Sequence, residues 1–245
     1  MTFKNPGELH WPALTCGVLI RRYKRFIAEV RLENGEVVTA HCANSGRMTE
    51  CCEPGRKVYL SFHDSPHRKL KYTWEIIDMP GSLVGVNTRI PNLLVNKSIN
   101  SGMITELRGY DCVLPEIKVG KSSRIDFLLT GRGKKNCFVE VKNCTLVKDG
   151  IAAFPDAVTS RGLKHLSELQ GLVSDNNRCV IFFLIQRMDA DIFMPADYID
   201  PEFGNQIREA CEKGVEVMAY DVVIDLEKIV LNRPVPVDMQ TSLLA

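Results

Sequence analysis

Residues 123–142 read SRIDFLLTGRGKKNCFVEVK, and this stretch decides how the second half of the chain is expected to fold. Apolar and polar residues alternate on both sides of the glycine- and lysine-containing segment Gly131–Lys135. Alternation with a period of two is typical of strands that are buried on one face. If Gly131–Lys135 forms a five-residue hairpin loop, Thr130 pairs with Asn136. The stretch therefore predicts a β-hairpin with a defined register.

The predicted register gathers charged side chains on one face of the hairpin. Asp126 lies opposite Glu140 and Arg124 opposite Lys142, because paired strands alternate together. Two facing carboxylates repel each other unless a proton or a cation lies between them. Mg²⁺ takes one or two carboxylates together with waters and phosphate oxygens. This face therefore predicts a Mg²⁺ or Mn²⁺ centre in which Asp126 and Glu140 hold the metal and Lys142 orients water or stabilises charge.

A third carboxylate usually completes such a centre, and two residues are candidates. Glu116 falls on the strand that should pair with the Asp126 strand, and Glu106 lies near the end of the preceding helical pattern. The alternative interpretation of the whole arrangement is a surface hairpin with cross-strand salt bridges, which is the common meaning of such charges. An Asp…Glu-x-Lys spacing occurs often by chance, so the flanking strands and helix must support the metal interpretation.

The first part of the chain reads as short strands between turns, without a long helical pattern. Asn34-Gly35 is a hairpin signal between the first two runs. Five short strands in about 70 residues favour a small barrel of the oligonucleotide-binding (OB) type, and a small β-sandwich is the alternative. The five runs are Gly17–Leu32, Glu36–Ala43, Lys57–Phe62, Tyr72–Asp78 and Ser82–Val86.

After about Pro91 the pattern changes to a mixture of helices and strands. Apolar residues at helical spacing predict a helix that ends at Gly109, and further helices are expected over about 160–173 and 201–213. Strands are expected at 112–119, 124–129, 137–141, 179–185 and 215–219. This order predicts an α/β domain with a mixed central sheet, so the whole chain is of mixed α+β class. The predicted domains are residues 1–87 and 88–245.

Net charge does not indicate a nucleic-acid partner, but local basic patches do. The chain has 31 basic and 30 acidic residues and a net charge of +1. Basic residues interleaved with an aromatic one suit phosphate contact and base stacking, and a charged edge strand is the alternative. A loop with Asn44 and Arg47 could bind phosphate or serve only as a turn. The basic run is Arg21, Arg22, Tyr23, Lys24 and Arg25, with Arg21, Tyr23 and Arg25 expected on one strand face.

The helix expected over 160–173 carries a second group of polar side chains. Arg161, Lys164, His165 and Glu168 fall on one side of it. Lys164 and His165 could contact substrate phosphate, and His165 could also carry a proton. The alternative is an ordinary solvated helix face.

The cysteine content and the lack of a visible export signal indicate the cellular compartment in which the protein is expected. Nine cysteines without an export signal favour reduced thiols in a cytoplasmic protein over a disulfide framework. No apolar run approaches the roughly 20 residues of a membrane helix. We therefore expect a cytoplasmic protein that does not associate with membranes.

Several stretches in a fixed order resemble the sugar fermentation stimulation protein A family. Asp126 with Glu140-Val141-Lys142 also resembles the motif of the PD-(D/E)xK nuclease superfamily. Ser45 stands where a threonine is common in the family, which is a conservative departure. The resembling stretches are RYKRF (22–26), HCANSGRM (41–48), VNT (86–88), ELRGY (106–110), SRIDF (123–127), EVK (140–142), FPDAVT (154–159), RGLKHL (161–166) and VIFF (180–183).

The resemblance implies an OB barrel followed by a restriction-endonuclease-like domain, DNA binding, and a regulatory link to sugar metabolism. Its motif falls on Asp126, Glu140 and Lys142 without substitution. The first hypothesis is a hydrolase, a metal-dependent deoxyribonuclease. The second is a non-catalytic DNA-binding regulator that retains the nuclease scaffold. Preservation of both carboxylates and the lysine favours the enzyme, because pure DNA binding would favour replacing buried acids near phosphate.

Overall fold

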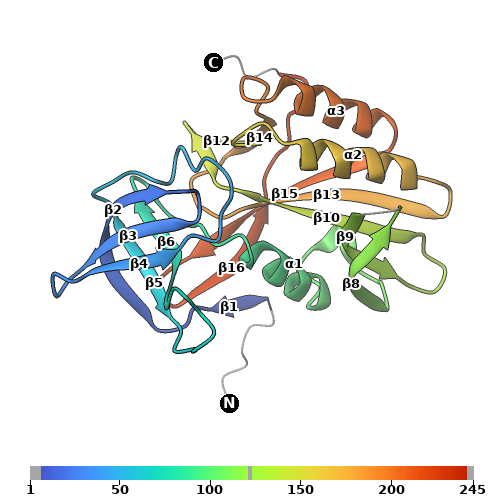
Figure 1. Cartoon of the computed structure of the whole chain (residues 1–245). Helices are drawn as coiled ribbons and strands as arrows, with labels where there is room; N and C mark the ends of the chain where they lie inside the picture. The colour runs from blue at the N-terminus through green and yellow to red at the C-terminus, as the bar shows by residue number, and fades with distance from the viewer. Residues whose placement is uncertain (1–6, 121–122, 242–245) are drawn as a thin grey trace.

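Strand pairing closes the first part of the chain into a barrel, seen at the left of Figure 1 in the computed structural model, which describes residues 7–120 and 123–241. The strands follow the order β4-β3-β2-β5-β6-β7, and a further parallel pairing of β4 with β6 closes five of them into a ring. The predicted five-stranded OB-type barrel is confirmed. The strands are β2 (Leu14–Tyr23), β3 (Ile27–Leu32), β4 (Val37–His41), β5 (Lys57–Phe62), β6 (Tyr72–Met79) and β7 (Ser82–Gly85).

The five strands of the barrel are not the five runs that the sequence predicted. The run Gly17–Leu32 is a hairpin, since Lys24 and Arg25 adopt left-handed φ values of 50° and 62° and turn the chain from β2 into β3. Alternation therefore stops at Tyr23, and the predicted common face of the basic run does not extend through the turn. The run at Ser82 forms β7, which pairs only with β6 and lies outside the closed ring.

A seven-stranded mixed sheet forms the centre of the second domain. Its order is β1-β16-β15-β13-β10-β9-β8, with parallel pairing among β10, β13 and β15 and antiparallel pairing toward both edges. This confirms the predicted mixed sheet. The strands are β1 (Glu8–His10), β8 (Cys112–Val119), β9 (Ser123–Thr130), β10 (Asn136–Cys144), β13 (Asn177–Ile185), β15 (Val215–Ile224) and β16 (Lys228–Pro234).

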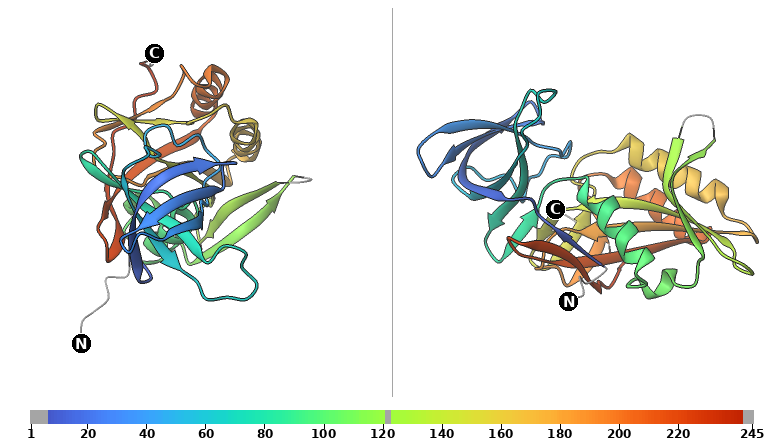
Figure 2. Two further views of the ribbon diagram at one scale, coloured as in Figure 1. Left: turned by 60° about the vertical axis from the view of Figure 1, so that its left-hand side comes forward. Right: turned by 90° about the horizontal axis from the view of Figure 1, so that it is seen from below.

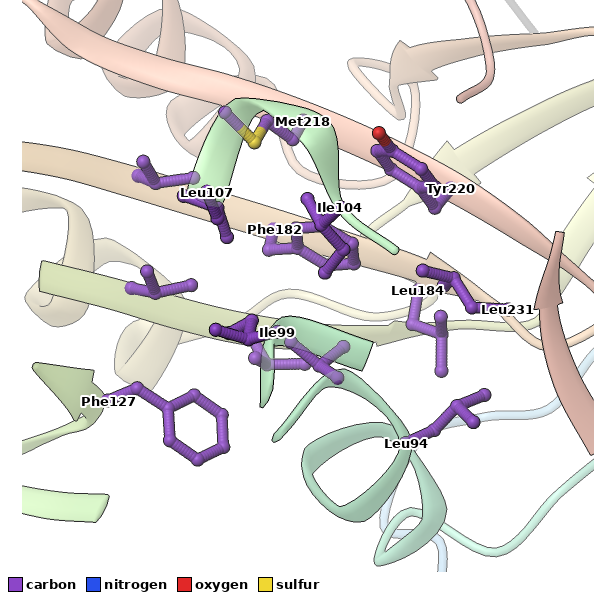
Figure 3. Close-up of a cluster of buried hydrophobic side chains, with 14 of the residues drawn as sticks. Leu94, Ile99, Ile104, Leu107, Phe127, Phe182, Leu184, Met218, Tyr220 and Leu231 are labelled. Atoms are coloured by element: carbon purple, nitrogen blue, oxygen red, sulfur yellow. The ribbon is translucent and has the colours of Figure 1, made fainter. Parts of the chain in front are cut away.

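Helices cover both faces of this sheet, which explains why β13 is apolar along its length. Figure 1 shows α2 (Ser160–Leu172) and α3 (Pro201–Glu212) on one face and α1 (Ile90–Asn100) on the other. Phe182 of β13 packs into the α1 layer together with Leu94, as Figure 3 shows. Its neighbour Phe183 packs into the α2–α3 layer. A strand buried on both faces needs apolar residues at every position.

The helix after Pro91 ends earlier than the sequence predicts. It stops at Asn100, and Gly102 has a φ of 71°, which the left-handed region allows to glycine. Ile104 and Leu107 belong to a turn and a short 3₁₀ helix, η1 (Thr105–Leu107), and both are buried in the same core (Figure 3). Their spacing imitates a continuous helix because both segments bury their apolar residues against one sheet face.

Five strands are absent from the sequence prediction: four of them are only three or four residues long, and the fifth is the seven-residue β16. β11 (Leu146–Lys148), β12 (Ile151–Phe154) and β14 (Ile192–Pro195) form a separate small sheet. β16 is the second strand from one edge of the seven-stranded sheet. The edge strand is β1, which pairs with β16, so residues Glu8–His10 join the sheet of the second domain. The predicted domain boundary at residue 87 remains a prediction. β1 precedes this boundary in the sequence but belongs to the sheet of the second domain.

Candidate metal centre and interdomain cleft

The hairpin of β9 and β10 has the predicted register. Phe127 pairs with Val139 and Leu129 with Cys137, as expected if Thr130 pairs with Asn136. The main-chain pairing of β9 with β10 ends at Phe127 and Val139. The next contact between the two strands uses a side chain: Asp126 Oδ2 accepts a hydrogen bond from the Val141 main-chain N–H at 2.8 Å. Asp126 is therefore held against β10 by its own carboxylate.

Asp126 has a second fixed partner, which the sequence prediction missed. Asn92 near the start of α1 donates from Nδ2 to Asp126 Oδ1 at 2.6 Å. Both carboxylate oxygens are thus oriented by neutral donors, and each keeps a further acceptor position. The signal in the sequence was slight, because Asn92 is one of several polar residues in α1.

Glu140, Lys142 and His165 form a buried cluster beside Asp126. Glu140 is 2% exposed, and its Oε1 accepts from Lys142 Nζ at 2.7 Å and lies in contact with His165 Nδ1. Lys142 Nζ also lies 3.0 Å from His165 Nδ1. Glu140 Oε2 is buried and has no hydrogen-bond partner among the described residues. A buried carboxylate oxygen without a donor is costly unless a cation or a ligand completes it.

The two carboxylates are perturbed in opposite directions. Burial, and then the neighbouring charge of Glu140, raises the pKa of Asp126 from 3.8 to about 6. Burial also acts to raise the pKa of Glu140, but the hydrogen bond from His165 and the charge of Lys142 outweigh it, so the pKa lies below its usual value. Below about pH 6 Glu140 therefore carries the negative charge of the pair while Asp126 holds a proton, and above about pH 6 both are ionised.

These residues fit a divalent cation. Two carboxylates and an orphaned oxygen offer the hard oxygen ligands that Mg²⁺, Mn²⁺ and Ca²⁺ prefer. A cation between Asp126 and Glu140 would remove the repulsion that raises the pKa of Asp126. No group of three or more His, Cys, Asp or Glu side chains placed to hold a metal occurs within residues 7–120 and 123–241. The candidate centre therefore rests on two protein carboxylates.

Neither predicted third carboxylate reaches this pair. Glu116 has a φ of 55° and lies 3.6 Å from Arg124 in an exposed ion pair on the β8–β9 hairpin, which projects from the domain in Figure 2. Glu106 lies in η1, where its Oε2 accepts from the Tyr220 hydroxyl at 2.7 Å. Neither lines the cleft around Asp126. Their placement corrects the prediction that one of them completes the centre, and Arg124 is paired with Glu116 on the exposed hairpin.

The candidate centre opens into a cleft of about 860 Å³ between the barrel and the second domain, here called the interdomain cleft. Asp126, Glu140 and Lys142 line its wall in the second domain. A volume of this size is typical of ligand-binding clefts. The facing wall is formed by Arg22, Arg25 and residues 44–47 of the barrel, and the remaining lining comes largely from Thr88, Pro91, Asn92, residues 143–146, residues 153–159 and Arg161.

Asp156 is a further carboxylate of the cleft, and the sequence analysis gave it no chemical role. Its Oδ2 accepts from the Met48 main-chain N–H at 3.0 Å and so joins the two domains. Gly46 lies against it, because a Cβ atom at Gly46 would be 2.3 Å from that oxygen. The signal available in the sequence was the stretch FPDAVT, which belongs to the family resemblance but carries no recognisable chemistry by itself.

Some basic residues of the barrel are used to hold its own loops, whereas others are exposed in the lining of the cleft. Arg22 donates to four main-chain carbonyls, those of Arg25, Asn44, Gly46 and Arg47, at 2.7–3.1 Å. Its guanidinium therefore shapes the 44–47 loop from within. The exposed side chains of Arg25 and Arg47 line the cleft.

Three further predicted nucleic-acid contacts lie elsewhere on the barrel or its turn. Arg21 forms a double hydrogen bond to Glu29 at 2.7 and 3.0 Å, and its guanidinium lies 5.0 Å from the centre of the Tyr23 ring. Arg21, Tyr23 and Lys24 do not line the interdomain cleft. Asn44 does line it, although its side chain is buried and bonds the Val86 carbonyl and the Gly46 N–H.

The predicted polar side of α2 splits into two parts. Thr159 caps the helix by accepting from the Gly162 N–H at 3.0 Å. His165 is 5% exposed and contacts Glu140, so the solvated-face alternative is wrong for it. Lys164 is exposed and does not line the cleft, whereas Arg161 does.

Comparison with known proteins identifies both domains. A family model described as the SfsA N-terminal OB domain matches residues 20–86, and one described as the sugar fermentation stimulation protein RE domain matches residues 89–228. A sugar fermentation stimulation protein homolog of Geobacter sulfurreducens is 51% identical over 224 residues, covering 91% of this chain and 96% of its own length. The homolog of Pelobacter propionicus is 50% identical over 226 residues, covering 92% and 98%.

A solved structure shares the whole architecture. It is described as the structure of Pyrococcus furiosus SfsA in complex with Ca²⁺, and it is 28% identical to this chain. The two superpose with a TM-score of 0.86, over 94% of this chain and 98% of the other. In the part of this chain that the structure describes, no helix is long and apolar enough to cross a membrane.

Proposed function

This chain belongs to the sugar fermentation stimulation protein family, and we propose that it is a DNA-binding hydrolase that cleaves phosphodiester bonds with Mg²⁺ or Mn²⁺. The observation that carries the proposal is the buried Glu140 Oε2, which has no hydrogen-bond partner in the described part of the chain and lies beside Asp126 at the wall of a cleft rimmed with arginines. A carboxylate pair of this kind suits a cation, and a basic rim suits phosphate.

Asp126 and Glu140 would hold the cation. When bound, it would supply charge stabilisation at the scissile phosphate and make water more acidic. The related Pyrococcus furiosus protein is described in complex with Ca²⁺, which takes the same oxygen ligands and supports a divalent site here.

The remaining groups of the cluster orient these ligands and the substrate. Asn92 and the Val141 N–H fix the two oxygens of Asp126. His165 contacts Glu140 Oε1 and lies beside Lys142 Nζ, so it restrains the rotamers of both. The Lys142 ammonium, whose side chain is 11% exposed, can orient a water or stabilise charge that develops on a phosphate oxygen.

The two walls of the cleft would grip the nucleic acid together. Arg25 and Arg47 on the barrel and Arg161 at the start of α2 face a phosphate backbone placed in the cleft. These contacts are independent of base sequence, so affinity should fall as salt rises. The barrel thus supplies strand binding and the second domain the reacting centre.

The test is cleavage of labelled single- and double-stranded DNA with Mg²⁺ or Mn²⁺. Asp126→Asn and Lys142→Ala are compared with matched controls on α3, Glu209→Gln and Lys213→Ala, whose side chains form an exposed pair with each other. We expect metal-dependent cutting by the native chain and both controls, and a loss of about 100-fold or more in the two centre variants.

The competing function is a DNA-binding regulator of sugar metabolism without catalysis. It predicts that the native chain binds DNA in a salt-dependent way and cuts it with neither metal. It also predicts that Asp126→Asn and Lys142→Ala bind DNA as well as the native chain does. That combination would replace the hydrolase proposal with the regulator.

A further inference from the structure

A second cavity of about 670 Å³ lies where the barrel, the N-terminal segment and the start of α1 meet, and it is here called the junction pocket. The barrel contributes β4, β6 and the loop between β5 and β6, and the other walls come from residues 9–12 and from α1. Its volume is within the range of small-molecule sites. The residues of the hydrolytic centre do not line it.

The junction pocket and the interdomain cleft lie on opposite sides of two chain segments, residues 43–44 and residues 88–89. Ala43 lines the pocket and its neighbour Asn44 lines the cleft. In the second segment Arg89 lines the pocket and Thr88 the cleft. The two segments are tied by the Thr88 hydroxyl and N–H, which both donate to the Ala43 carbonyl. The pocket is therefore a separate site that shares a wall with the cleft.

A buried carboxylate lines this pocket. Glu75 is 5% exposed, and it accepts from Ser61 Oγ at 2.6 Å and Asn87 Nδ2 at 2.7 Å. Within the described ranges it forms no ion pair. A carboxylate has about four acceptor positions, and two of them are used. Glu75 is thus suited to accept from N–H donors of a ligand.

Other residues that line the pocket are basic, aromatic or apolar, unlike the acidic Glu75. Arg68, Lys69 and Arg89 bring three positive charges to it, which suit a phosphate. Trp11 and Leu93 give it an aromatic and apolar wall. Trp11 is held in place because its Nε1 donates to the Asp225 carbonyl at 2.9 Å and its ring packs against the hydrophobic core, and a planar ring in the pocket can stack on the part of the Trp11 side chain that lines it.

We propose that the junction pocket binds a nucleotide and prefers guanine. The phosphate lies among Arg68, Lys69 and Arg89, the base stacks on Trp11, and the N–H edge of the base faces Glu75. Guanine offers two neighbouring N–H donors on one edge, whereas uracil places two carbonyl oxygens beside its single N–H and is repelled by a carboxylate. The nucleotide is either free or one unit of a strand, and the site does not depend on the proposed hydrolysis.

Tryptophan fluorescence reports directly on this site. The chain has two tryptophans, and Trp74 is fully buried in the barrel core. GMP, AMP, UMP and a short guanine-containing single strand are titrated into the full-length protein in EDTA, so that nothing is cut. We expect quenching with affinities in the order GMP, AMP, UMP, and no quenching in Trp11→Phe.

Three variants make the test specific. Arg89→Ala should weaken GMP binding about 10-fold or more, and Glu75→Gln should remove the preference for GMP over UMP. Arg56→Ala is the matched control, because Arg56 lies on the barrel outside both cavities and pairs with Glu53. Circular dichroism melts establish that each variant is folded.

The outcomes separate the two sources of the nucleotide. Binding of GMP that is lost in Arg89→Ala identifies a free nucleotide. Binding of the strand alone, lost in the same variant, identifies a nucleotide within a strand. The proposal is overturned if neither GMP nor the strand binds, if Arg89→Ala binds like the native chain, or if GMP and UMP both bind and do so with equal affinity. A chain that binds GMP but cuts no DNA would leave this proposal standing and remove only the hydrolase.

Discussion

Replacing Asp126 by asparagine should make the metal-free protein more stable at neutral pH, although it removes a residue of the candidate centre. The pKa of Asp126 is raised from 3.8 to about 6, by burial and by the charge of Glu140. Below about pH 4 the group is protonated in both the folded and the unfolded chain. Between pH 4 and 6 the unfolded chain releases the proton and the folded chain keeps it, so the free energy of unfolding falls as pH rises.

The size of the effect follows from the shift in pKa. Raising a pKa from 3.8 to about 6 corresponds to about 3 kcal/mol at pH values above both. Asparagine cannot ionise and avoids this loss, but it has one acceptor where Asp126 uses two. A flip of the Asn92 amide restores that hydrogen bond, and without the flip the variant loses about 1 kcal/mol at every pH. Because the loss of a hydrogen bond is the same at every pH, the pH-dependent part of the difference in free energy of unfolding reports only the titration of Asp126.

The assay is urea unfolding followed by circular dichroism, in EDTA, between pH 4.5 and 8. The difference in free energy of unfolding between Asp126→Asn and the native chain should increase by about 2 kcal/mol from pH 4.5 to pH 8. Glu209→Gln, an exposed carboxylate on α3, should show no comparable increase. Parallel curves for Asp126→Asn and the native chain would refute the buried, repelled state of Asp126.

The remaining predictions concern the walls of the cleft and the buried cluster. Arg22→Ala frees four carbonyls and should lower the free energy of unfolding by about 2–4 kcal/mol, measured in urea, with no rescue by lysine. Gly46→Ala should displace Asp156, so its effect on DNA affinity should be less than additive with Asp156→Ala in a double-mutant cycle. His165→Ala should reduce Mn²⁺ affinity about 10–100-fold by calorimetry, through loss of a group that orients Glu140.

The parts of the fold that sequence predicts are those set by local pattern. The hairpin register around Asp126 and Glu140 follows from alternation and loop length, which involve neighbouring residues only. The buried strand β13 follows equally from its continuous apolar run. The end of α1 could not be predicted, because Ile104 keeps the spacing of a helix while packing from a turn.

The missed residues of the site owe their positions to contacts between distant parts of the chain. Asp156 meets Met48 across 108 positions, and Asn92 meets Asp126 across 34. A lone asparagine or a Pro-Asp turn has no local signature of such a contact. The same reason explains Arg22, which sequence assigns to nucleic acid although the fold uses it to hold four carbonyls.

The interdomain cleft belongs to neither domain alone. Asp126 and Glu140 provide a wall built on β9 and β10, of which β10 is buried from Cys137 to Val141, whereas the facing wall is a loop that Arg22 holds in shape. The Asp156–Met48 hydrogen bond is one of the contacts that join the barrel to the second domain, together with the bonds from Arg187 to the Glu50 carbonyl and from the Met188 N–H to Ser82. In the proposed function, phosphate contacts from the barrel position a strand at the carboxylate pair only while these contacts hold the two walls together. Variants at the junction should consequently change DNA affinity and cleavage together, even though none of them touches the metal.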